Sequence, residues 1–174
     1  MTIKNLVPLI DEEAIQRRIL EMAEEINAVY KDEPLVVVCV LKGAFMFFSD
    51  LVRHLTCRPE IDFVRLASYG SGSEGGQTIS FTKDVEIPLK DKHVLIVEDI
   101  VDTGESIEHM IKELEARNPA SVEVCTLFFK PGSYRKTLPI KYRAMEIGNE
   151  FIVGYGLDYD QLGRSLKDIY VVTE

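Results

Sequence analysis

The stretch VLIVEDIVDTGES, residues 94–106, is the most informative part of this chain. It opens with a continuous apolar run of strand length, and this run ends in two adjacent carboxylates, Glu98 and Asp99. Continuous apolar strands are typical of parallel sheets that are buried on both faces. Three residues after Asp99, Asp102 opens a short polar loop that leads into a segment with helical periodicity. The stretch therefore predicts a buried strand, a loop and a helix, which together form part of a βαβ unit.

Segments of the same two kinds flank this stretch on both sides. The predicted strands cover residues 35–41, 61–69, 93–99 and 121–129, with shorter strands near 151–155 and 169–172. The predicted helices cover residues 11–30, 44–55 and 106–117. Strands that alternate with helices indicate an α/β fold with a mostly parallel sheet. Because no linker, repeat or low-complexity tract interrupts this pattern, we expect a single domain over residues 1–174.

Composition and charge restrict the possible partners. The chain has 174 residues, 46% of them hydrophobic, which is enough for one sizeable core. Its formal net charge of −9 argues against nucleic-acid binding, because phosphate contacts need clustered Lys and Arg. No apolar run approaches the ~20 residues of a membrane helix, and residues 1–11 show no secretory signal. We therefore expect a cytosolic protein that binds neither membranes nor nucleic acids.

The cysteine and histidine content does not indicate a disulfide or a zinc site. The cysteine count is odd, and no CxxC pair occurs among Cys39, Cys57 and Cys125. Cys39 and Cys125 lie in apolar runs, so we expect them to be reduced and buried. HxH and HExxH patterns are the usual mark of a zinc ligand set, and the three histidines form neither.

The loop that follows the central strand has the composition of an anion site. Free N–H groups at a helix start and the positive end of the helix dipole attract anions. Gly104 lets the backbone approach an anion closely, and Thr103 and Ser106 add hydroxyl donors. The alternative is that this loop has only a structural role, in which Asp102 caps the helix.

The carboxylates before this loop point to a second kind of ligand group. Glu98 and Asp99 have the wrong charge for a phosphate, but they suit sugar hydroxyls or a magnesium ion and its waters. A single ligand with a phosphate, a diol and a metal ion satisfies the whole stretch, and a ribose phosphate fits that description. The alternative is that the two acids are a solvated strand end.

This stretch resembles the phosphoribosyl pyrophosphate (PRPP) signature of type I phosphoribosyltransferases, and in detail that of their hypoxanthine-guanine branch. The likeness extends to Leu41-Lys42-Gly43, Ser68-Tyr69, Lys130 and residues 151–164. It implies a mostly parallel central sheet flanked by helices, with a small hood formed by the chain ends. It also implies magnesium-dependent transfer of the phosphoribosyl group from PRPP to a 6-oxopurine, with hypoxanthine as the expected base and guanine as a further one.

The resemblance assigns a role to each residue that matches the family pattern. The residues expected at the ribose and magnesium are Glu98 and Asp99, with Asp158 reaching a second magnesium. The residues expected at the 5-phosphate are Asp102, Thr103, Gly104, Glu105 and Ser106. The residues expected at pyrophosphate are Lys42, Gly43 and Arg164, and those expected at the purine are Lys130, Phe151, Ile152 and Asp158. In the family the loop aspartate, here Asp102, is also the general base, and Ser68 and Tyr69 belong to a mobile lid.

Several points stay open at the level of the sequence. Glu105 adds a negative charge beside a phosphate loop, so we expect its side chain to point to solvent. The peptide before Lys42 can be cis in the family. Guanine or xanthine could be preferred over hypoxanthine, and a nucleic-acid-binding regulator or a pure nucleotide-binding module could share the fold. The family commonly forms homodimers or homotetramers, and nothing in the sequence chooses between them.

Overall fold

A computed structural model describes residues 5–69 and 78–173 of the chain. Its helices are α1 (Glu12–Val29), α2 (Phe45–His54) and α3 (Glu105–Glu115). Its strands are β1 (Leu6–Ile10), β2 (Leu35–Leu41), β3 (Glu60–Tyr69), β4 (Thr78–Lys83), β5 (His93–Val101), β6 (Ser121–Phe129), β7 (Tyr142–Glu146), β8 (Ile152–Val153) and β9 (Ile169–Val172).

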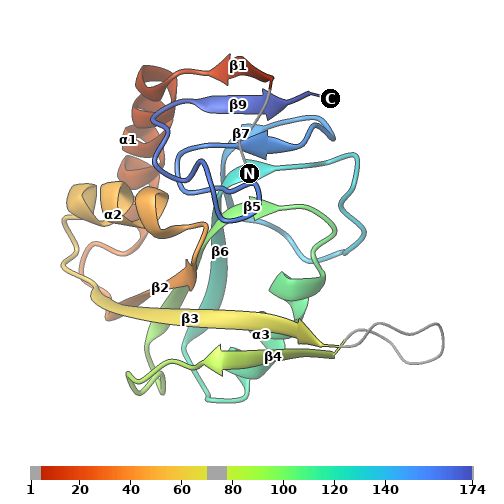
Figure 1. Cartoon of the computed structure of the whole chain (residues 1–174). Coiled ribbons are helices and arrows are strands. Elements are labelled where there is room, and N and C mark those ends of the chain that lie inside the picture. The colour runs from red at the N-terminus through yellow and green to blue at the C-terminus, as the bar shows by residue number, and fades with distance from the viewer. Residues whose placement is uncertain (1–4, 70–77, 174) are drawn as a thin grey trace.

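The strands form a large sheet and a small one (Figure 1). The large sheet has the order β4-β3-β2-β5-β6-β7, and every neighbouring pair is parallel except β3 with β4. The small sheet has the order β1-β9-β8 and is antiparallel. Because β1 and β9 come from opposite ends of the chain, this small sheet is the expected hood. The predicted α/β fold is confirmed.

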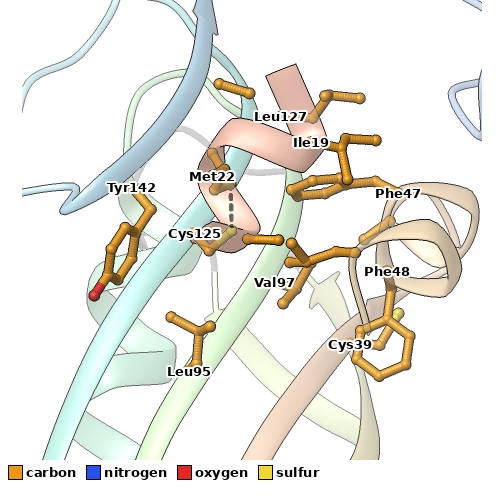
Figure 2. Packing of buried hydrophobic residues seen from close by; sticks show 14 of the residues in the cluster. Ile19, Met22, Cys39, Phe47, Phe48, Leu95, Val97, Cys125, Leu127 and Tyr142 are labelled. Atoms are coloured by element: carbon orange, nitrogen blue, oxygen red, sulfur yellow. Dashed lines mark hydrogen bonds between the residues drawn. The ribbon is translucent and has the colours of Figure 1, made fainter. Parts of the chain in front are cut away.

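Both faces of the large sheet are covered, which explains the continuous apolar strands. On one face Val37 and Cys39 of β2 pack with α1 and α2, and on the other face Val36 and Val38 pack with α3. Figure 2 shows the first of these clusters, in which the Cys125 Sγ lies 3.1 Å from the Met22 Sδ. Successive strand residues point to opposite faces, so a strand covered on both sides is apolar at nearly every position.

The structure also differs from the expected elements in several places. Strand β5 continues through the two acids to Val101, and α3 begins one residue earlier than predicted, at Glu105. Strands β1, β4 and β7 were not predicted from the sequence. Helix α1 begins where expected, because the Asp11 Oδ1 accepts a hydrogen bond from the Ala14 N–H at 2.8 Å. Within residues 5–69 and 78–173, no helix has the length and apolar character needed to cross a membrane.

Candidate active site

The junction between β5 and α3 forms an open pocket of about 160 Å³. It is lined by Glu98, Ile100 and every residue from 101 to 107. The residue that precedes the helix is Gly104, whose φ of 89° lies in the left-handed region, and no side chain caps this helix end. The alternative in which Asp102 caps the helix is therefore wrong. The Glu105 N–H has only a long contact of 3.5 Å with the Thr103 Oγ1, and N–H groups at a helix start of this kind can bind an anion.

An acidic pair lies just before this loop, in which Glu98 is buried and Asp99 is half-buried. Glu98 is only 9% exposed, and the Asp99 N–H donates to the Glu98 Oε1 at 3.1 Å. Burial, followed by repulsion from Asp99, raises the pKa of Glu98 well above its usual range. Burial also raises the pKa of Asp99, although the nearby Arg164 opposes this shift. Because the two carboxylates are hard to ionise together, a nearby cation or hydrogen-bond donor would stabilise their charged forms.

A magnesium ion fits this acidic pair. Magnesium is usually held by one or two carboxylates together with substrate phosphates rather than by an all-protein cage. Glu98 and Asp99 supply two carboxylates beside the anion pocket, and burial disfavours their charged forms until a cation arrives. In the part of the chain that the structure describes, no group of three or more His, Cys, Asp or Glu residues could hold a metal ion alone.

A second open pocket, of about 280 Å³, adjoins the first. It is lined by Asp99, Ile100, Asp102, Lys130, Phe151, Ile152, Leu157 and Asp158. Asp102 and Ile100 line both pockets, so Asp102 stands between them. The structure thus brings the residues expected at the phosphate next to those expected at the purine.

Lys130 projects into the second pocket from the carboxyl end of β6. The residue is only 8% exposed, and its Nζ donates to the Glu150 carbonyl at 3.0 Å. The same Nζ lies 3.6 Å from the Asp102 Oδ2. A buried ammonium with three donors and two neighbouring oxygens can still donate to a ligand. The alternative in which Lys130 is a surface lysine is wrong.

Phe151 and Ile152 line the same pocket as Lys130 and directly follow Glu150, whose carbonyl Lys130 contacts. The Phe151 side chain is not part of the core, because the residue is 55% exposed and packs edge-on against Tyr159 with ring centroids 5.7 Å apart. Ile152 is buried in β8. An exposed aromatic ring on the rim of a pocket offers a free face for stacking.

Asp158 and Arg164 form one connected unit at the edge of this pocket. The Arg164 Nη2 lies 2.6 Å from the Asp158 Oδ1, and the Arg164 Nη1 donates to the Gly156 carbonyl at 2.8 Å. The Asp158 Oδ2 accepts from the Gln161 N–H at 2.8 Å, and Gln161 Oε1 in turn accepts from the Lys42 Nζ at 2.7 Å. This chain of contacts connects the residues expected at pyrophosphate with Asp158.

The short loop after β2 approaches the acidic pair closely. A Cβ atom on Gly43 would overlap the Asp99 carboxylate, so a side chain at this position would displace that carboxylate. The peptide between Leu41 and Lys42 is cis. Ser68 and Tyr69 end β3, where their backbones pair with Ile79 and Thr78 of β4. The glycine-rich segment expected to form the rest of the lid, residues 70–77, lies outside the described residues.

Sequence reasoning missed four residues at or beside the site. Leu157 and Ile100 line the second pocket, but an apolar residue in sequence gives no sign that it faces a ligand. Gln161 connects Lys42 with Asp158. Lys136 binds the Glu105 carboxylate with its Nζ 2.8 Å from the Oε1, so Glu105, although largely exposed, is paired rather than free in solvent.

Comparison with known proteins agrees with this geometry. The sequence model of the family described as "Phosphoribosyl transferase domain" matches residues 9–160. The hypoxanthine phosphoribosyltransferase of Haemophilus influenzae is 42% identical over 161 residues, which cover 91% of this chain and 90% of that protein. The hypoxanthine-guanine-xanthine phosphoribosyltransferase of Tritrichomonas foetus is 40% identical over 168 residues, covering 95% of this chain and 91% of that one.

Solved structures are similar over nearly the whole chain. A crystal structure of a hypoxanthine-guanine phosphoribosyltransferase from Bacillus anthracis, with HEPES in its active site, matches with a TM-score of 0.92 and 35% identity, covering 99% of this chain and 100% of that one. A hypoxanthine phosphoribosyltransferase from Staphylococcus aureus matches with a TM-score of 0.91 and 36% identity, covering 96% and 91%. By sequence, fold and site, this chain belongs to the phosphoribosyltransferase family.

Proposed function

We propose that this chain is an enzyme of purine salvage that transfers the 5-phosphoribosyl group of PRPP to hypoxanthine, and also to guanine. The products are IMP or GMP and pyrophosphate. The observation that carries the proposal is that two pockets meet at Asp102. One is lined by residues 102–106, which we call the anion loop, and the other by Lys130 and Phe151. The activities named for the relatives from H. influenzae and T. foetus support the same reaction.

PRPP occupies the first pocket and the space towards Gly43. The 5-phosphate accepts hydrogen bonds from the N–H groups of residues 103–106, and the ribose hydroxyls donate to Glu98 and Asp99. Pyrophosphate lies against the backbone of Lys42 and Gly43 and against the guanidinium of Arg164, whose planar fork suits a phosphate. Magnesium, held by Glu98 and Asp99 with Asp158 close to a second ion, would neutralise charge on the leaving pyrophosphate.

The purine occupies the second pocket. The Lys130 ammonium has donors and no acceptor, so it favours the keto oxygen of a 6-oxopurine over the amino group of adenine. Phe151 stacks on the purine ring, while the backbone of Ile152 meets the edge of the base. Asp158 lies at the same pocket wall.

The reaction exchanges one bond at the anomeric carbon for another. N9 of the purine forms the new bond, and the bond to the pyrophosphate oxygen breaks with its electron pair leaving on pyrophosphate. The ribose ring passes through an oxocarbenium-like state, which the carboxylates of Glu98, Asp99 and Asp102 tolerate. Asp102 accepts the proton of the purine at N7. The lid that begins at Ser68 and Tyr69 excludes water, which would otherwise hydrolyse the activated sugar.

The same proposal covers the setting of the enzyme. We place it in the cytosol as a single domain of residues 1–174 that assembles into a homodimer or homotetramer. The described cysteines, Cys39, Cys57 and Cys125, are all free thiols, as a reducing compartment requires. Light scattering on the purified chain measures the assembly directly.

The test of this function is pyrophosphate release from PRPP by the purified chain. Hypoxanthine, guanine, xanthine and adenine are supplied separately, with magnesium and after its removal by a chelator. We expect turnover with hypoxanthine and guanine, none with adenine and none without magnesium. Turnover with xanthine alone would show that the proposed base is wrong. No turnover with any base would indicate that the chain is a regulator or a nucleotide-binding module instead of an enzyme.

A further inference from the structure

The segment that follows Lys130 packs against the back of the anion loop. We call residues 130–136 the strap. The Lys130 N–H donates to the Val101 carbonyl at 3.0 Å, and the Arg135 N–H donates to the Thr103 carbonyl at 3.1 Å. A Cβ atom on Gly104 would lie 2.5 Å from the Tyr134 ring and 2.8 Å from the Lys136 Cγ. The strap therefore holds the loop by backbone hydrogen bonds and by close packing.

The strap also places a positive charge beside the first turn of α3. This turn carries Glu105 and Glu108. The Lys136 Nζ lies 2.8 Å from the Glu105 Oε1 and 3.0 Å from the Glu108 Oε2, and its side chain is only 16% exposed. The hydrogen bond from Lys136 is the main cause that lowers the pKa of Glu108, and the bond to Glu105 is the main cause that raises the pKa of Lys136.

Two carboxylates in this turn have opposite effects on the helix and on a bound anion. They stabilise the positive end of the helix dipole. They also repel a phosphate dianion that approaches the same N–H groups, because like charges within a few ångströms raise each other's energy. Lys112, whose Nζ is 3.5 Å from the Glu108 Oε2, is 69% exposed and contacts only one of the two acids. Lys136 alone among the described residues bridges both.

We propose that Lys136 is a positioning residue of the 5-phosphate subsite. Its ammonium cancels the repulsion from Glu105 and Glu108, and its aliphatic stem fixes the loop at Gly104. The anion loop of this chain can therefore carry a glutamate directly after its glycine and still bind a phosphate. This inference rests on the proposed assignment of the 5-phosphate to residues 102–106.

The test is the affinity of the full chain for IMP, measured by titration calorimetry without turnover. Lys136→Met keeps the packing stem and removes the charge, so we expect IMP binding to weaken about 3- to 10-fold. Lys136→Arg should bind IMP nearly as well as the wild type. Glu105→Gln introduced into Lys136→Met should restore most of the lost affinity, because it removes a carboxylate that lacks its partner. Lys112→Met is the matched control and should change affinity less than about twofold.

The outcomes separate a charge effect from a purely structural one. If the role of Lys136 were only structural, the loss of IMP affinity in Lys136→Met would persist after Glu105→Gln is added. That loss would also be the same at low and at high salt, whereas a loss caused by charge becomes smaller at high salt. Wild-type IMP affinity in a folded Lys136→Met protein would overturn the inference. Lys136→Gln serves as a second variant if the methionine variant does not fold. A wild-type chain that binds neither IMP nor PRPP would remove the phosphate assignment and this inference with it, whereas IMP binding without turnover would overturn only the proposed reaction.

Discussion

At the scale of single residues, the site depends on a few charged groups that the fold places within reach of one another. Asp102 lies where the two pockets meet, and its Oδ2 is 3.6 Å from the Lys130 Nζ. In the proposed reaction this carboxylate exchanges a proton with the base in the second pocket, and the ammonium beside it holds the oxygen of that base. The two side chains therefore make separable contributions to rate and to selectivity.

Asp102→Asn tests the proton transfer. Asparagine keeps the size and polarity of the side chain but cannot accept a proton, so we expect kcat to fall about 100-fold or more. The KM for PRPP should change little, because the loop backbone is retained. Steady-state kinetics measures both constants. Asp32→Asn, an exposed change in the turn before β2, is the control. Near-normal turnover in Asp102→Asn would remove the general-base role.

Lys130→Met tests the selectivity for a 6-oxopurine. Loss of a hydrogen bond from a charged group costs about 1.5–3 kcal/mol, so kcat/KM for hypoxanthine should fall about 10- to 150-fold. The KM for PRPP should stay near its wild-type value. The measurement is kcat/KM for hypoxanthine and for adenine, with the exposed Lys90→Met as control. An unchanged preference for hypoxanthine over adenine would show that Lys130 does not contact the base.

At the scale of elements, the junction of β5 and α3 is set by backbone geometry. Gly104 has a φ of 89° and lies under the Tyr134 ring, so both its conformation and its lack of a side chain are required. In the proposed site, this loop binds an anion through N–H groups at the helix start, where Gly104 offers no side-chain cap and the Glu105 N–H has only a long 3.5 Å contact with the Thr103 Oγ1.

Gly104→Ala tests this junction. A side chain with positive φ costs about 1–3 kcal/mol, and the new methyl group would displace the ring of Tyr134. We expect unfolding in urea to show a loss of stability of that size and the KM for PRPP to rise. Gly132→Ala is a matched control in the strap, because its Cβ would meet Asn149 at an ordinary 3.6 Å. Equal stability and KM in the two variants would contradict this account of Gly104.

At the scale of the whole molecule, a partly buried polar cluster connects the C-terminal segment to the helices. The Tyr155 hydroxyl donates to the Asp50 carboxylate in α2. The Gln16 Nε2 in α1 donates to the Asp50 Oδ2 at 2.8 Å and to the Tyr155 oxygen at 3.1 Å. Burial and, after it, the bond to Asp50 raise the pKa of Tyr155. The cluster connects both helices to the chain between Ile152 and Asp158.

Tyr155→Phe tests this connection. Removal of a hydrogen bond to a carboxylate that is partly buried should lower the free energy of unfolding by about 2 kcal/mol, measured in urea. The KM for hypoxanthine should rise as well, because Ile152 and Leu157, which line the purine pocket, lie on either side of Tyr155 in the chain. Tyr170→Phe is the control, since its hydroxyl lies at a longer 3.3 Å from the Asp168 Oδ2. Equal losses of unfolding free energy in Tyr155→Phe and Tyr170→Phe would show that the cluster does not stabilise the fold more than an ordinary tyrosine hydrogen bond.

Much of the fold was readable from the sequence because its strands are buried on both faces. The apolar runs in β2 and in the first part of β5 have no polar alternation, which is typical of a sheet covered by helices on both sides. Strands β4 and β7 lie at the edges of the large sheet and carry no such run. Strand β1 lies at the edge of the small sheet, and its short apolar run is interrupted by Pro8. It pairs with β9 from the other end of the chain, so local pattern did not identify it.

By itself the sequence determined the chemistry of the anion loop, because its acids, glycine and hydroxyls are contiguous and act through local backbone geometry. Only the tertiary structure decided which distant residues join that loop. Lys130 reaches Asp102 because β6 pairs with β5, and Lys136 reaches Glu105 because the strap folds back over Gly104. Such contacts depend on the packing of segments separated along the chain, and nothing in the local sequence records where a side chain will lie once those segments pack.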